Sequence, residues 1–120
     1  MDENDLKLRT KKYALRVIKL VEALPKTQTG RTVGNQLIRC GTSVAANYRA
    51  VCRARSSAEF IAKLGVVVEE ADESAFWLEI IVESGLIKKE LLIALLQETN
   101  EIVAIMVASI KSSRSNKSKI

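Results

Sequence analysis

Four stretches of apolar residues at helical spacing, separated by short breaks, limit this 120-residue chain to a helical bundle. In the first stretch, Leu6, Tyr13, Val17, Leu20 and Leu24 follow one another at spacings of seven, four, three and four residues, which places them on one helical face. The composition agrees, because the chain has one Pro, five Gly and an apolar content of 48%. We therefore predict an all-α fold, an antiparallel up-down-up-down four-helix bundle.

The breaks between the stretches set the predicted helix boundaries. Pro25 ends the first helix, because the residue before a proline is pushed out of the α region. Ser56 followed by Glu59 matches an N-terminal capping box, and Gly85 suits the left-handed position that ends a helix. The predicted helices cover about residues 5–24, 31–55, 57–84 and 88–111, so the bundle spans residues 1–111. Residues 112–120 are rich in Ser and Lys, and we predict a disordered basic tail there.

Small residues mark the second predicted helix. Gly41 costs this helix about 1 kcal/mol relative to Ala, and we expect the close approach of another backbone to compensate. Ala46, Ala50 and Ala54 recur at four-residue spacing, which also allows tight contact with a neighbouring helix.

The fourth predicted helix carries more apolar residues than one core-facing stripe needs. Leu91, Ile93 and Ile105 lie outside its main stripe. This surplus predicts a second contact surface and hence a homo-oligomer. The alternative is that these residues are scattered exposed aliphatic side chains.

Basic and acidic residues occupy different parts of the chain. Residues 7–55 contain twelve Lys or Arg and one acid, a local charge of +11, whereas residues 59–101 contain ten Asp or Glu and three Lys, a local charge of −7. Like charges repel unless an opposite charge lies against them. Either the two halves pair, within or between chains, or the basic half binds a polyanion.

The basic residues of the first two helices are therefore the candidate nucleic-acid-binding residues. Arginine presents a planar fork suited to phosphate, and a helix with several of them can neutralise a nucleic-acid backbone. Arg49 and Arg53 are four residues apart and so adjacent on a helix. The candidates are Lys7, Arg9, Lys11, Lys12, Arg16, Lys19, Arg31, Arg39, Arg49, Arg53 and Arg55. The alternative is that the arginines pair with carboxylates of the third helix, namely Glu69, Glu70, Asp72, Glu73, Glu79 and Glu83.

The residues that most enzymes use are missing. The chain has no His, which removes the commonest general base and metal ligand, and it has no Gly-rich phosphate loop. A di-iron bundle site needs Glu-x-x-His pairs and is excluded, which leaves a carboxylate-only magnesium site as a remote alternative. Cys40 and Cys52 are too few for a disulfide framework or a zinc site, so we interpret them as reduced packing residues. We predict no enzymatic activity, no cofactor and no metal.

Two further expectations concern location and the aromatic residues. The first dozen residues are charged, with no apolar core after them, and no uninterrupted apolar run approaches the roughly 18 residues of a membrane helix. We therefore expect a cytoplasmic protein without membrane contact. Tyr48, Phe76 and Trp77 are interpreted as packing residues of the core or of a subunit interface, with base stacking as the alternative.

A long ordered string in the second and third predicted helices carries a family resemblance. It reads QLIRCGTSVAANYR at 36–49, RARS at 53–56, EFIAKL at 59–64, EADES at 70–74, FWLE at 76–79 and ESGL at 83–86. The string resembles the bacterial four-helix-bundle proteins encoded in intervening sequences of 23S ribosomal RNA genes (S23-like proteins), from about residue 8 to residue 111. Ala50 departs from the pattern where an acidic residue is common, and Glu69 departs where a Lys is common.

The resemblance implies a ring-shaped homopentamer. It also implies a fold similar to the accessory protein of diversity-generating retroelements, which is thought to bind nucleic acid and a reverse transcriptase. The implied partners are thus further copies of the chain, RNA or DNA, and a nucleic-acid-processing protein. Together with the charge pattern, we predict a non-enzymatic homo-oligomeric bundle that binds RNA or DNA through its first two helices. The alternative is a protein–protein interaction scaffold with no direct nucleic-acid role.

Overall fold

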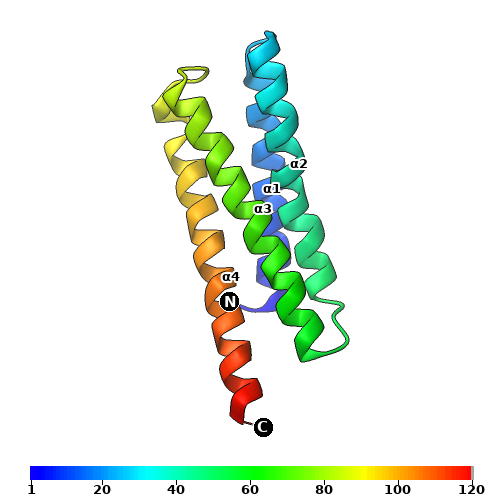
Figure 1. Cartoon of the computed structure of the whole chain (residues 1–120). Coiled ribbons are helices and arrows are strands. Elements are labelled where there is room, and N and C mark those ends of the chain that lie inside the picture. The colour runs from blue at the N-terminus through cyan, green and yellow to red at the C-terminus, as the bar shows by residue number, and fades with distance from the viewer. Residues whose placement is uncertain (120) are drawn as a thin grey trace.

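The computed structural model is an antiparallel bundle of four helices joined by short connections (Figure 1). The helices are α1 (Glu3–Ala23), α2 (Gln28–Val51), α3 (Ser57–Glu83) and α4 (Ile93–Lys119), and a short 3₁₀ helix, η1 (Lys89–Leu91), precedes α4. The structure describes the backbone of residues 1–119 and the side chains of residues 1–116. Over this range it contains no strand, and the predicted all-α four-helix bundle is confirmed.

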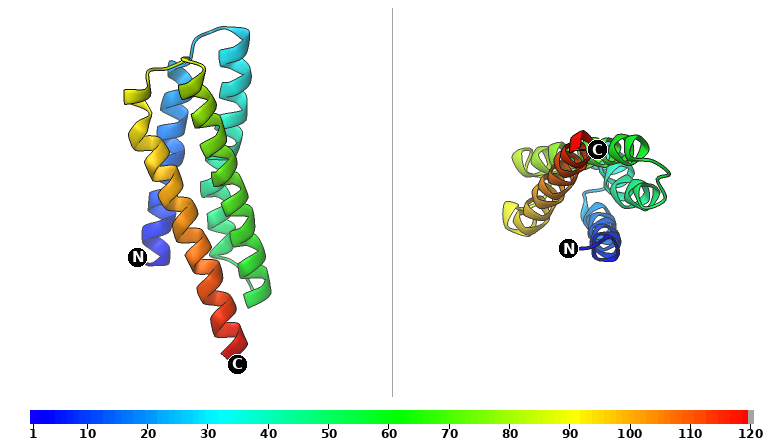
Figure 2. Two further views of the ribbon diagram at one scale, coloured as in Figure 1. Left: turned by 60° about the vertical axis from the view of Figure 1, so that its left-hand side comes forward. Right: turned by 90° about the horizontal axis from the view of Figure 1, so that it is seen from below.

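Each helix packs mainly against its neighbour in sequence, whereas α1 and α4 meet more loosely. The bundle measures 53 × 21 × 21 Å, and α4 extends past the other helices at the end where α1 begins (Figure 2). Long side chains bridge the α1–α4 seam. Tyr13 reaches Thr99 there, and Arg9 reaches Glu98.

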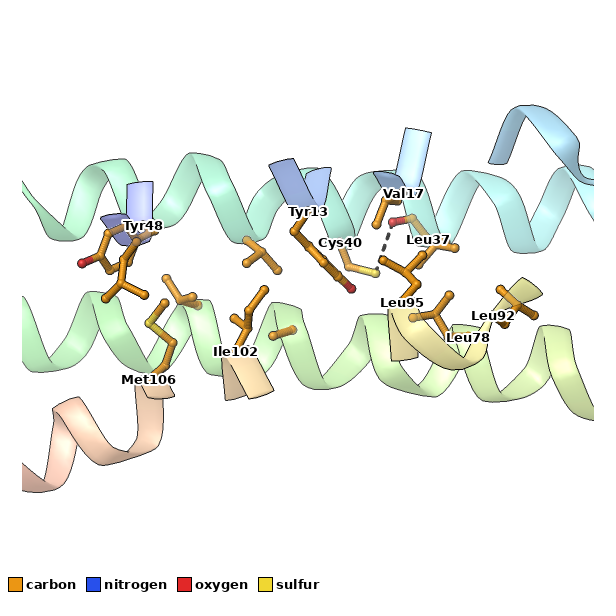
Figure 3. Packing of buried hydrophobic residues seen from close by; sticks show 14 of the residues in the cluster. Tyr13, Val17, Leu37, Cys40, Tyr48, Leu78, Leu92, Leu95, Ile102 and Met106 are labelled. Carbon is orange, nitrogen blue, oxygen red and sulfur yellow. Dashed lines mark hydrogen bonds between the residues drawn. The ribbon is translucent and has the colours of Figure 1, made fainter. Parts of the chain in front are cut away.

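The core is mainly aliphatic (Figure 3), and near the middle of the bundle each helix contributes one polar group to it. The Tyr13 hydroxyl donates to Thr99 Oγ1 at 2.7 Å, and Thr99 donates to the Leu95 carbonyl at 2.8 Å. Ser74 Oγ lies 3.3 Å from Cys40 Sγ and donates to a backbone carbonyl of its own helix. Burial raises the pKa of Tyr13 to about 12, so the phenol stays neutral. This alignment of the helices along the bundle axis is favoured, because sliding one helix past its neighbour would leave buried polar groups without hydrogen-bond partners.

Gly41 allows α1 to approach α2 closely. A Cβ atom at this position would lie 2.7 Å from Cγ1 of Val17 and 2.9 Å from its Cγ2. The expected close approach is therefore present, although a valine side chain, rather than a backbone, occupies the space that the missing Cβ leaves.

Capping residues place the helix ends differently from the prediction. Thr27 caps α2 by accepting from the Gly30 N–H at 3.1 Å, so α2 starts at Gln28 and not near residue 31. Helix α2 also ends at Val51 and not near residue 55, because the chain needs a turn between α2 and α3. Ser56 follows this turn and caps α3 as predicted. Arg53 therefore lies in this turn, not on the helix. Gly85, with φ of 74°, occupies the predicted left-handed position after α3.

The prediction of a disordered tail is wrong for residues 112–119, because α4 continues to Lys119. The segment contains no Gly or Pro, so nothing in it stops the helix. Ile120, the last residue of the predicted tail, lies outside the described residues.

α4 is apolar along much of its length, and part of this apolar surface is not covered by the rest of the chain. By length and composition alone, residues Ile93–Asn116 could cross a membrane, with a mean hydropathy of 1.4, and 22% of that window is buried inside the bundle. Its Glu98 and Glu101 pair with Arg9, which ties the helix into the bundle. Leu91 and Ile93 are 71% and 51% exposed, whereas Ile105 is partly buried. The predicted surplus of apolar residues is thus exposed surface at the start of α4.

Candidate nucleic-acid interface

Two candidate arginines are held by the protein's own carboxylates. Arg9 donates through Nε and Nη2 to both oxygens of Glu98, at 2.8 and 2.7 Å, and through Nη2 to Glu101 at 3.0 Å. The hydrogen bond to Glu98 is the largest cause of a raised pKa for the Arg9 guanidinium. Arg9 therefore ties α1 to α4, and it is not positioned to bind a ligand.

Arg39 on α2 is neutralised in the same way by α3. Its guanidinium bonds Glu73 and lies 3.5 Å from Glu70. For this arginine the geometry supports pairing with the third helix, the alternative interpretation of the sequence. Arg31 is held by a backbone carbonyl rather than by a carboxylate, because its Nη1 donates to the Lys26 carbonyl at 2.9 Å near the start of α2.

The remaining eight candidates are exposed, and within residues 1–116 no ion pair with a carboxylate holds any of them. Their charges therefore remain available to an external anion. They are Lys7, Lys11, Lys12, Arg16, Lys19, Arg49, Arg53 and Arg55.

One group of these cations lines a furrow between α2 and the start of α3. The furrow encloses about 470 Å³, and its cations are Arg49, Arg53, Arg55 and Lys63. Ala46 and Ala50 also line it. The alanine ridge expected to give tight helix contact therefore leaves a hollow instead at these two positions, because no side chain from α3 fills the space that the small residues leave.

A second furrow, of about 520 Å³, runs between α1 and α2. Its rim carries Lys7, Lys11 and Arg49, and Leu8 and Ala46 contribute apolar surface. Arg49 and Ala46 line both furrows, so the two hollows flank the C-terminal half of α2 and meet at Arg49. Lys12, Arg16 and Lys19 line neither furrow.

Lys63 is a residue of this surface that the sequence analysis missed. It belongs to the acidic third segment, and it lies 3.8 Å from Glu59 one turn earlier on α3. The signal that could have found it is its position two turns after the cap Ser56. An antiparallel hairpin brings that part of α3 beside the end of α2.

No aromatic residue lines either furrow, although the partly buried Phe60 lines an adjacent hollow together with Arg55. Tyr48 is buried, and burial raises the pKa of its hydroxyl. Phe76 is 50% exposed and packs edge-to-face on Trp77, with the two ring centroids 5.0 Å apart. The Trp77 Nε1–H donates to Glu73 at 3.4 Å. Tyr48 and Trp77 therefore act as packing residues, the interpretation that the sequence analysis preferred, whereas half of the Phe76 side chain faces solvent.

The exposed outer face of α3 is acidic around Phe76. Over residues 1–116 these carboxylates form no ion pair, and no group of three or more His, Cys, Asp or Glu side chains there could hold a metal ion. The face carries Glu69, Asp72, Phe76, Glu79 and Glu83, which we call the acidic α3 stripe. Both cysteines are free, and burial is the largest cause of their raised pKa values.

Comparisons with known proteins agree with this architecture. The model of the family described as 23S rRNA-intervening sequence protein matches residues 3–108. The chain is also similar to a crystal structure, at 1.70 Å resolution, of a protein of unknown function from the S23 ribosomal protein family of Bacteroides thetaiotaomicron. The TM-score is 0.83 and the identity 31%, and the match covers 88% of this chain and 98% of that one. No curated protein matches the sequence.

Proposed function

The chain belongs to the 23S rRNA-intervening sequence protein family, and we propose that it is a non-enzymatic, homo-oligomeric bundle that binds RNA or DNA through exposed cations of α1 and α2. The supporting observation is that eight lysines and arginines of this region have no carboxylate partner among the side chains of residues 1–116. Such cations gain free energy by releasing the counterions that surround a polyanion. The proposed contact is with phosphates and does not read the base sequence.

Salt dependence tests this proposal directly. We expect the chain to bind structured RNA or DNA in a filter-binding assay, and the logarithm of the association constant should fall linearly with the logarithm of salt concentration. About five phosphate contacts would lower the affinity about 500-fold between about 50 and 200 mM salt. The absence of binding at low salt, or binding that does not change with salt, would contradict the proposal.

A second candidate function, a protein–protein interaction scaffold, is favoured by the acidic α3 stripe. In this bundle α1 and α3 lie diagonally, since each packs against α2 and α4, so their outer faces point in opposite directions. The outer face of α1 carries exposed Leu8 and Leu15 among its lysines, and the acidic α3 stripe carries exposed Phe76. The two faces are complementary in charge and both have an apolar centre, which suits a head-to-tail contact between copies.

Light scattering tests this self-association. We expect an oligomer of the wild type at micromolar concentration, a pentamer by family resemblance, and we expect Phe76→Ser to shift it toward the monomer because the substitution removes the apolar centre of the contact. Leu91→Ser tests the alternative contact surface at the start of α4, since Leu91 is also exposed, at 71%, but lies outside the acidic α3 stripe. A monomeric wild type, or an unchanged oligomer of Phe76→Ser, would contradict this contact.

A further inference from the structure

We propose that the ligand of the basic surface is a nucleic-acid double helix, whose phosphate backbone occupies the two furrows on either side of α2 with Arg49 at their junction. This inference rests on the proposed nucleic-acid binding and specifies its ligand and its central residue. It rests on three observations, which are the distribution of charge along the furrows, the chemistry of their floors and the location of the aromatic residues.

The cations form one continuous track. Lys7 and Lys11 line the α1–α2 furrow, Arg53 and Arg55 line the α2–α3 furrow, and Arg49 belongs to both. None of these five forms an ion pair with a carboxylate within residues 1–116. Lys63 adds a sixth positive charge, partly balanced by Glu59 at 3.8 Å. A phosphate backbone that follows this track meets positive charge along both furrows.

The alanines that line the two furrows offer nothing that reads a base. Ala45, Ala46 and Ala50 present only methyl groups, and the polar side chains that line the furrows are the cations, Asn4 in the α1–α2 furrow and Glu59 in the α2–α3 furrow. Lysine and arginine can bind phosphate oxygens, and such contacts position a nucleic acid without specifying its sequence.

The absence of an aromatic platform in the furrows favours a duplex over a single strand. Proteins that bind single strands without sequence preference stack the bases on aromatic side chains, at about 1–3 kcal/mol per base. No aromatic residue lines either furrow. Tyr48 is buried, Phe76 lies in the acidic α3 stripe, and Phe60, which lines a neighbouring hollow with Arg55, is partly buried against the core. A duplex keeps its bases paired inside and presents its phosphates at higher charge density, so it needs no stacking partner.

The test compares Arg49→Gln with Arg39→Gln. Both substitutions remove one arginine from α2. Arg39 is neutralised by Glu70 and Glu73, whereas no carboxylate within residues 1–116 forms an ion pair with Arg49. We expect Arg49→Gln to lower the slope of log affinity against log salt by about 0.9 on duplex DNA, so that the loss between about 50 and 200 mM salt falls from about 500-fold to about 150-fold. Arg39→Gln should leave the slope unchanged. Thermal unfolding monitored by circular dichroism should show that both variants fold.

The probes are duplex DNA, duplex RNA and oligo(dT) with equal numbers of phosphates. We expect the wild type to bind at least one duplex about tenfold more tightly than the oligo(dT) at equal salt. Tighter binding of oligo(dT), or an equal effect of the two arginine substitutions, would overturn the furrow proposal while leaving nucleic-acid binding in place. No binding of the wild type to any probe would overturn the proposed function itself.

Discussion

Replacement of Gly41 by Ala is expected to lower the free energy of unfolding by about 1–2 kcal/mol, although Ala is the better helix former. The new Cβ would lie 2.7 Å from Val17 Cγ1, well inside van der Waals contact, and Val17 is fully buried and branched at its Cβ atom. Since Val17 has no space into which it can move, α1 must shift away from α2. This strain outweighs the roughly 1 kcal/mol that Ala gains in helix propensity.

Gly65→Ala is the matched control for this prediction. Gly65 also lies inside a helix, α3, but a Cβ atom there would meet nothing within 4 Å. The same substitution should therefore raise the free energy of unfolding by up to about 1 kcal/mol. The free energies of unfolding of the two variants should differ by about 1–3 kcal/mol in thermal or urea unfolding, in opposite directions from the wild type.

A third variant separates steric overlap from other causes. Val17→Ala removes the atoms that the new Cβ would meet, so Gly41→Ala should cost less in the Val17→Ala background than in the wild type. Stabilisation of the wild type by Gly41→Ala, or a cost that does not depend on Val17, would show that the close packing of α1 on α2 does not determine the effect.

The helical periodicity predicted the fold because each helix buries one stripe. Leu6, Tyr13 and Val17 of the first predicted face are buried, and the single Pro and the later Gly85 lie at the breaks. The boundaries of α2 were missed for a local reason. The predicted start near residue 31 leaves Thr27 outside the helix although its hydroxyl caps it, and the predicted end near residue 55 leaves no room for the turn before Ser56.

Part of the candidate site could not be predicted from the sequence because pairing depends on helix rotation. Arg39 and Arg49 are ten residues apart on the same helix and equally basic, yet one faces Glu70 and Glu73 and the other lines two furrows. Arg9 shows the same limit, since its partners Glu98 and Glu101 lie at the other end of the chain. Only the packing of four helices decides which cations are neutralised.

The furrows likewise depend on tertiary structure. The alanine spacing on α2 is compatible with tight contact or with a hollow, and the orientation of α3 decides between the two. Lys63 joins the basic surface from an acidic segment for the same reason, because the turn after α2 brings the first part of α3 beside Arg49. The local charge indicated the correct region of the chain but not the set of residues.

Reversal of two charges in the furrows should have the largest effect on function. The double variant Arg49→Glu with Arg53→Glu removes two phosphate contacts and places two carboxylates where a phosphate backbone would lie. At about 100 mM salt each lost contact costs about eightfold in affinity by counterion release alone, and repulsion adds to this. We therefore expect a loss of about 100-fold or more in a filter-binding assay with duplex DNA or RNA.

The double variant Lys88→Glu with Lys89→Glu is the matched control. It changes the formal net charge by the same amount, from +5 to +1, but these exposed lysines lie at the α3–α4 connection, at the opposite end of the bundle from Arg49. A ligand bound in the furrows contacts neither of them. Its affinity should therefore fall only about threefold, through the loss of long-range electrostatic attraction that salt already screens. Equal losses in the two double variants would mean that net charge, and not the arrangement of cations around α2, attracts the nucleic acid. A large loss confined to the furrow variant would locate the contact on this face, because the two proteins carry the same total charge.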